Sequence, residues 1–400
     1  MRPAALSLFF TRFNITITSL LSLSLSLLLT ACQPVNFEAD NDAQTQRPIL
    51  RIYNWVEYMP QQIIDNFEKE TGIEVIYDTY DSNEQMYNRI TQSVANSARS
   101  VSDTSTGNQA PYDLVIPSSY FVDRMRHEDL LHPIDKSKLN NFSQLNPKTL
   151  DTFIDPNNNY SIPYLWGTTG IAIDSQAIDP NTVNRWQDLW RPEFKGRLLL
   201  SNDMREVFGM ALLSLGYSIN SENPEEIRQA YEKLLKLLPN VAVMESEFSR
   251  SGYMTDRADI GMIWSGEIML AQKQGMDYLT YKYPSEGAIL WIDSLVIPKN
   301  AQNIEAAYRF INFILRSENA RIISRQTGYA TPNLGARLFM TPSEIANTTI
   351  YPTQEQFNNA ELHTAISADA LKIYEFYWNK LLERSKQLET EQTAITTSAK

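Results

Sequence analysis

Residues 53–60 read Tyr-Asn-Trp-Val-Glu-Tyr-Met-Pro, and they stand where a first β-strand should give way to a helix. In open α/β sheets the ligand crevice lies at the carboxyl ends of the strands, so Trp55, Glu57 and Tyr58 are in position to contact a ligand. Aromatic faces attract cations and a carboxylate neutralises them, so these side chains suit a cation with an apolar body. The alternative is a core tryptophan beside a solvated glutamate.

The residues on either side of this stretch predict a β-α-β unit. The pattern indicates a strand at 49–53, a helix at 60–71 that stops at Gly72, and a second strand at 74–77. Because such crossovers are right-handed almost without exception, the two strands should lie parallel in one sheet.

The rest of the chain continues the alternation of strands and helices. Further strands are expected at 113–116, 160–174, 196–201 and 259–264, with two more within 288–297. Helices are expected at 83–93, from an N-cap at Ser119 to near Leu131, and at 204–216, 223–238, 266–274, 304–315, 318–327 and 367–386. The chain crosses between two sets of elements more than once, which predicts an α/β protein with two lobes around a cleft.

The N-terminal segment predicts export. Residues 1–31 contain two arginines and a serine-rich apolar run that is too short for a comfortable membrane span, as in a signal peptide. Residues 29–32, Leu-Thr-Ala-Cys, resemble a bacterial lipobox, whose cysteine is lipidated. Cys32 is the only cysteine, so no internal disulfide is expected. We therefore expect a periplasmic lipoprotein anchored to the membrane through Cys32, with residues 32–47 as a flexible tether.

The overall charge narrows the range of partners. A formal net charge of −12 disfavours nucleic acid and anionic lipid, and it favours cations. The chain has only three histidines, and no G-x-S-x-G, phosphate-binding glycine loop or H-E-x-x-H motif. Asp155 opens a calcium-loop-like run, but Tyr160 and Trp166 stand where that loop needs glycine and glutamate. We therefore expect no catalytic residue, metal or cofactor, and we interpret 155–159 as a turn.

Aromatic and acidic residues recur at four predicted strand ends. They are Trp55, Glu57 and Tyr58; Asp203 and Glu206; Trp264; and Trp291 with Asp293, with Tyr120 and Tyr329 as further rings. A cleft of this kind suits a flexible polycation, because buried ammonium groups need anionic partners and methylene groups need apolar walls, worth about 0.8 kcal/mol per buried CH₂. Each of these residues could instead have a purely structural role. Asp203 and Glu206 fit a helix capping box, and the rings fit a core.

Runs of residues spread over most of the chain resemble the sequence of one known protein family. These runs are 53–55 with 57–58, 70–73, 112–115, 135–139, 160–164, 205–208, 261–264 and 293–295. On these runs, residues 50 to about 382 resemble the bacterial periplasmic spermidine/putrescine-binding proteins, the substrate receptors of polyamine ABC transporters. The resemblance implies the type II periplasmic-binding-protein fold. Residues 48–167 and 292–337 would form the N-terminal lobe, residues 168–291 and 338–388 the C-terminal lobe, and residues 389–400 a frayed tail.

The resemblance also implies the binding site. The amines would pair with Glu57, Asp203, Glu206 and Asp293, and the ring walls would be Trp55, Tyr58, Tyr120, Trp264, Trp291 and Tyr329, with Ser118 as a polar neighbour. The chain departs from the family at Val56, where a threonine is expected, and at His363, which takes the place of a ligand-contacting glutamine. Residues 96–109 are an insertion. The changes at Val56 and His363 bear on whether spermidine or putrescine is the preferred ligand.

The resulting hypothesis is a monomeric receptor that captures spermidine or putrescine by lobe closure and passes it to an ABC transporter permease without breaking bonds. Two alternatives stay open. A glycoside hydrolase also combines rings with carboxylates, although four carboxylates exceed the two that its chemistry needs. A binding protein for another cation or for a sugar is the second, although a neutral sugar would not require so many carboxylates with only Arg205 nearby.

Overall fold

The computed structural model describes residues 47–98, 111–245 and 249–398. The predicted signal peptide, Cys32, nearly all of the tether and most of the insertion lie outside these ranges. Within them, no helix combines the length and the apolar character that a bilayer span requires.

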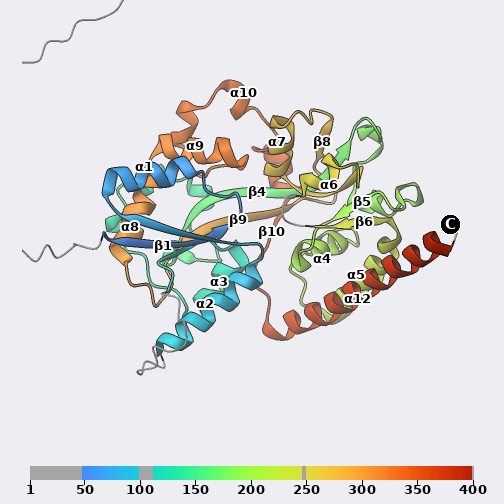
Figure 1. Cartoon of the computed structure of the whole chain (residues 1–400), viewed down its shortest axis with the longest axis horizontal. Coiled ribbons are helices and arrows are strands. Elements are labelled where there is room, and N and C mark those ends of the chain that lie inside the picture. Colours follow the sequence, from blue (N-terminus) through green and yellow to red (C-terminus); the bar gives the residue numbers. More distant parts are fainter. Residues whose placement is uncertain (1–46, 99–110, 246–248, 399–400) are drawn as a thin grey trace, which may run out of the picture. The chain divides into compact units, whose positions relative to one another are not determined.

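Among the described residues, ten strands form one sheet in the order β2-β1-β3-β9-β4-β7-β5-β6, with β10 beside β9 and β8 beside β4. Their bounds are β1 (Ile49–Trp55), β2 (Glu74–Tyr80), β3 (Leu114–Val115), β4 (Ser161–Asp174), β5 (Leu198–Leu200), β6 (Val241–Met244), β7 (Ile260–Trp264), β8 (Leu279–Lys282), β9 (Ile289–Val296) and β10 (Glu361–Leu362). The predicted β-α-β unit is confirmed, because β1 and β2 pair in parallel. The long strands β4 and β9 pair antiparallel and connect the two ends of the sheet (Figure 1).

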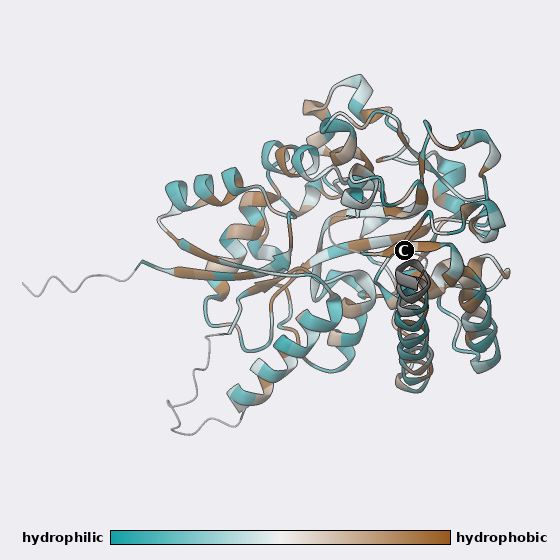
Figure 2. Cartoon of the chain, turned by 45° about the vertical axis from the view of Figure 1, so that its right-hand side comes forward, coloured by the Kyte–Doolittle hydropathy of each residue, from teal (hydrophilic) through white to brown (hydrophobic). Residues whose placement is uncertain are grey.

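Helices cover both sides of this sheet (Figure 1). They are α1 (Gln61–Thr71), α2 (Asn83–Ala98), α3 (Ser119–His127), α4 (Met204–Leu213), α5 (Pro224–Leu237), α6 (Arg250–Met254), α7 (Ser265–Lys273), α8 (Ile304–Ile314), α9 (Ser317–Thr327), α10 (Pro342–Ile345), α11 (Gln354–Asn359) and α12 (Ala368–Ser398). The strands are largely hydrophobic, whereas the outward faces of the helices are hydrophilic (Figure 2). The sheet is therefore the centre of the buried core.

The buried apolar residues gather in separate clusters at the two ends of the sheet. One cluster combines β1, α1, the start of β4, the end of β9 and α8, and it includes Ile52, Phe67 and Phe310. Another combines the end of β4 with β5, α4 and α5, and it includes Trp186 and Phe208. Two cores joined by two long strands are what a two-lobed α/β protein requires.

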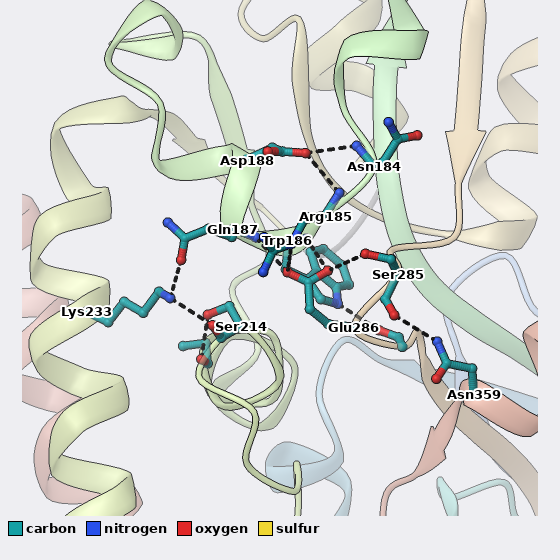
Figure 3. Close-up of polar contacts among 12 residues, drawn as sticks. Asn184, Arg185, Trp186, Gln187, Asp188, Ser214, Lys233, Ser285, Glu286 and Asn359 are labelled. Atoms are coloured by element: carbon teal, nitrogen blue, oxygen red, sulfur yellow. Dashed lines mark hydrogen bonds and ion pairs between the residues drawn. The ribbon is translucent and has the colours of Figure 1, made fainter.

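A polar network fixes the loop that leads into β9 (Figure 3). The Glu286 carboxylate accepts hydrogen bonds from the backbone N–H groups of Trp186 and Gln187, both at 3.1 Å. The Lys233 ammonium of α5 in turn donates to the Gln187 side chain and to the Ser214 carbonyl. The bonds to Glu286 satisfy backbone N–H groups that would otherwise have no partner. Together with the Lys233 bonds, they link the loop before β9 to the core cluster that includes Trp186.

Two predictions about strands and caps are wrong. The segment 288–297 contains the single strand β9 (Ile289–Val296), because this strand is buried throughout and pairs with β4 along its length. Ser119 is the first residue of α3, not its N-cap, and α3 ends at His127. Ser118 takes the N-cap position, but its hydroxyl accepts a hydrogen bond from Asn83 and does not cap the helix.

The last helix is longer than predicted. Segment 389–400 is expected to fray, yet α12 continues as helix as far as Ser398. No glycine or proline interrupts this part of the sequence. Arg384 supports the extension by donating to Gln387 and Glu391 along the helix surface.

Candidate functional site

A cavity lies between the two groups of elements. The space not filled by atoms is about 830 Å³, including the part open to solvent. All the predicted binding residues line it, namely Trp55, Glu57, Tyr58, Ser118, Tyr120, Asp203, Glu206, Trp264, Trp291, Asp293, Tyr329 and His363. The structure therefore brings the whole predicted set together, and contact of each residue with a ligand stays a prediction.

The ends of strands place most of these side chains, as the α/β pattern predicts. Trp55 is the last residue of β1, and Trp264 is the last residue of β7. Asp203 immediately precedes α4. Trp291 and Asp293 lie within β9 two residues apart, so their side chains point to the same face of the sheet.

Asp293 is a buried carboxylate with one free oxygen. The Tyr58 hydroxyl donates to its Oδ2 at 2.7 Å. Its Oδ1 has no hydrogen-bond partner of normal geometry, although the Ser118 hydroxyl is close enough to favour the charged form. Burial raises the pKa of Asp293 to about 6, against the lowering effect of Ser118 and Tyr58. The structure thus leaves an acceptor that a cation could satisfy.

A second acidic group lies at the start of α4. The Asp203 carboxylate caps the helix by accepting from the Glu206 N–H at 3.0 Å, so the predicted N-cap is confirmed. Glu206 is buried, and its Oε2 has no hydrogen-bond partner of normal geometry, although the Thr169 hydroxyl is close enough to favour the charged form. Burial, followed by the charge of Asp203, raises the pKa of Glu206 well above its ordinary value. Glu84 of α2, which sequence reasoning missed, belongs to the same group, since burial and then Asp203 raise its pKa to about 7.

Aromatic rings form the walls. Trp55 and Trp264 meet edge to face with their centroids 6.5 Å apart, and Tyr329 meets Trp291 in the same way at 5.2 Å. Glycines make room for two of these rings. A Cβ on Gly266 would lie 2.3 Å from the Tyr329 ring, and one on Gly167 would lie 2.6 Å from the Trp291 ring.

Glu57 is already paired with a cation from a distant part of the chain. Its φ of 53° places it in the left-handed region, and its Oε2 accepts from Arg250 Nη2 at 2.8 Å. Arg250 also donates from Nη1 to both oxygens of Glu267. Sequence reasoning missed Arg250 and Glu267. Glu267 could have been found, because it lies in the first turn of the helix that follows Trp264.

His363 is a neutral member of the cavity wall. Burial, followed by the charge of Arg205, lowers its pKa well below the ordinary value, and its Nε2 has no hydrogen-bond partner. Its ring meets Tyr120 edge to face at 5.6 Å. The Arg205 guanidinium donates to the Thr364 carbonyl and to Asn220. The imidazole is therefore available as a neutral hydrogen-bonding group.

The cavity wall is acidic. Six carboxyl side chains line it, and among the residues described here none of the lining side chains is lysine or arginine. The six are Glu57, Asp81, Asp203, Glu206, Glu267 and Asp293. Within the same ranges, no three His, Cys, Asp or Glu side chains are grouped as metal ligands. Separated carboxylates between aromatic walls suit a ligand with several positive charges on an apolar chain.

Comparisons with known proteins agree with this description. The sequence profile of a family described as bacterial extracellular solute-binding proteins matches residues 62–353. The spermidine/putrescine-binding periplasmic protein of Escherichia coli K12 is 47% identical over 332 residues, covering 83% of this chain and 91% of that protein.

Solved structures show the same likeness. A structure titled as a spermidine/putrescine ABC transporter protein from Listeria monocytogenes has a TM-score of 0.76 and 37% identity, covering 83% of this chain and 98% of that one. A spermidine/putrescine ABC transporter substrate-binding protein from Streptococcus pneumoniae has a TM-score of 0.71 and 35% identity, covering 84% and 99%.

Proposed function

Because this chain belongs to the bacterial extracellular solute-binding proteins, we propose that it captures spermidine or putrescine between its lobes and delivers it to an ABC transporter permease. The relatives that support this proposal are named for binding spermidine and putrescine, and they match over most of both chains. The observation that carries it is the cavity itself, in which Asp293 and Glu206 each have, between aromatic walls, a buried carboxylate oxygen without a hydrogen-bond partner of normal geometry.

The carboxylates and the aromatic rings recognise different parts of a polyamine. Asp293 accepts one ammonium, and the pair Asp203 and Glu206 accepts another, so that both buried acids are neutralised. Trp291 and Trp264 cover the methylene groups, and their faces add cation–π attraction of roughly 0.5 to 2 kcal/mol each. The neutral His363 lines the wall near Tyr120 without opposing the ammonium charge.

The related proteins are named as periplasmic, which supports a place outside the cytoplasm. From the N-terminal sequence we propose Cys32 as the lipidated anchor, and we propose a monomer as the working form. We place the lobes at 48–167 with 292–337 and at 168–291 with 338–388, closing on the amine. No bond-breaking step is part of this function, since the relatives are named for binding and transport.

A neutral sugar fits the cavity less well than a polyamine does. Its hydroxyl groups would leave the buried carboxylates without charge compensation, which is costly. Calorimetric titration with spermidine, putrescine and maltose separates the two functions. Heat of binding with the amines and none with maltose would support the proposal, and binding of maltose alone would overturn it.

We expect polyamine affinity to rise with pH through about 6. Asp293 must lose its proton to pair with an ammonium, and burial raises its pKa to about 6. Below that pH the affinity should fall by up to about tenfold per pH unit for this one proton. Titration calorimetry between about pH 5 and pH 8 measures the dependence. An affinity that stays constant across pH 6 would contradict an ionised Asp293 as the partner.

The raised pKa of Asp293 has the opposite effect on the stability of the ligand-free protein, which should fall as the pH rises. Because the folded pKa of Asp293 lies above its ordinary value of 3.8, ionisation costs folding free energy. That cost is absent below the ordinary pKa and develops fully above about pH 6. Asp293→Asn should remove both this loss of stability and the step in affinity near pH 6.

A further inference from the structure

The side chain of an arginine bridges the two lobes beside the cavity. Arg250 begins α6 on one side, and its guanidinium holds Glu267 through Nη1, at 3.0 Å to Oε1 and 2.9 Å to Oε2. Nη2 donates across the cleft to Oε2 of Glu57, at 2.8 Å, in the loop after β1. Both acids line the cavity, so one arginine neutralises part of the negative charge at this end.

This pairing is held firmly. The side chains of Arg250 and Glu267 are each only 9% exposed, and charge-assisted bonds of this kind are among the stronger hydrogen bonds. Glu57 is held at a positive φ of 53°, a conformation that costs free energy in a residue other than glycine and that clusters at ligand sites. Breaking the Arg250–Glu267 pair would leave buried charge uncompensated, which is strongly unfavourable, whereas the Glu57 side chain is 48% exposed.

Five of the six acids of the wall fall into two kinds, according to whether Arg250 contacts them. Asp293 and Glu206 each present a buried oxygen without a hydrogen-bond partner of normal geometry, and the Asp203 carboxylate accepts from the Glu206 N–H. The guanidinium of the nearby Arg205 donates to the Thr364 carbonyl and to Asn220. Glu57 and Glu267, in contrast, share the guanidinium of Arg250. A ligand ammonium that approached this second pair would meet a positive charge already in place, and like charges brought together cost several kcal/mol.

We propose that Arg250 is a specificity-determining residue, which occupies the Glu57 and Glu267 carboxylates and so favours a diamine over a triamine. The inference rests on the proposed function. A diamine places its two ammonium groups at Asp293 and at the Asp203 and Glu206 pair. At the Glu57 end of the cavity, the third ammonium of a longer amine must displace the arginine or lie against carboxylates that the arginine already neutralises.

The test compares the dissociation constants for putrescine and spermidine, measured by titration calorimetry on the whole chain. The central variant is R250M/E267M, which removes the buried ion pair together and leaves Glu57 free. Replacing both partners with apolar residues of similar size is often neutral for folding. The single variant Arg250→Lys keeps the charge. The matched control is Arg257→Met, since Arg257 is half-exposed and its guanidinium holds Glu245 rather than a cavity acid.

We expect R250M/E267M to shift the preference toward spermidine by roughly tenfold or more relative to wild type. Arg250→Lys and Arg257→Met should keep the wild-type preference. An unchanged preference in the double variant overturns the inference, as does an equal loss of affinity for both amines, which would make Arg250 only a closure contact. Wild-type protein that binds neither amine would instead overturn the proposed function, and this inference with it.

Discussion

Asp293→Asn should weaken the binding of putrescine and spermidine by about 30-fold to several thousand-fold, since losing one partner of a buried charge pair costs roughly 2 to 5 kcal/mol. The substitution keeps the size of the side chain and places a neutral amide against the ammonium. Asp293 is suited to this test because it is buried and bonded on one oxygen by Tyr58, while the other oxygen has no partner of normal geometry. Titration calorimetry gives the affinity directly.

Two further measurements separate a binding role from a folding role. Ligand-free Asp293→Asn protein should unfold at the same temperature as wild type or at a higher one near pH 7, because a buried ionised group has been removed. Asp369→Asn makes the same chemical change at an exposed site on α12, where Asp369 pairs with Lys372. It should leave affinity unchanged. Wild-type affinity in Asp293→Asn would remove this residue from the site.

Trp291→Ala should lower affinity by about 30-fold or more, because buried aromatic residues at the centre of a binding site typically contribute 2 kcal/mol or more. The ring lies against Tyr329 and passes close to Gly167. Trp291→Phe keeps an aromatic face and should retain most of the affinity. Calorimetry with both amines measures each variant.

Loss of packing is the competing explanation for Trp291. Truncating a buried tryptophan also costs about 3 to 5 kcal/mol of stability, so each variant is first compared by thermal unfolding. Trp190→Ala is the matched control, because that ring lies outside the cavity and donates to the Lys233 carbonyl. It should lose stability and keep affinity. If Trp291→Ala binds both amines as wild type does, the ring serves packing alone.

The sequence carries enough information for the fold class and for the gathering of the site. The two-lobe type II periplasmic-binding-protein fold is confirmed by the likeness to the solved structures. Strand ends collect side chains at one edge of an α/β sheet, so Trp55 and Trp264 come together although they are far apart in the chain. Asp203 shows that two interpretations of one residue are compatible, since it caps α4 and also lines the cavity.

The contacts across the cleft could not be predicted from local patterns. Arg250 and Glu57 are 193 residues apart, and no periodicity or capping rule relates them. Their pairing depends on how the two groups of elements are positioned. Ser119 illustrates the same limit on a smaller scale. Local preference favours a cap, but its hydroxyl donates to the carbonyl of His363, which comes from the far end of the chain.

The central claim is that an acidic, ring-lined cavity holds a polyamine through its carboxylates, and calorimetric titration of the whole chain with putrescine, spermidine and maltose tests it most directly. The account predicts saturable binding of the amines, no heat with maltose, and loss of amine binding at low pH as Asp293 becomes protonated. Failure of both amines to bind at neutral pH, or binding that is indifferent to Asp293→Asn, would contradict it.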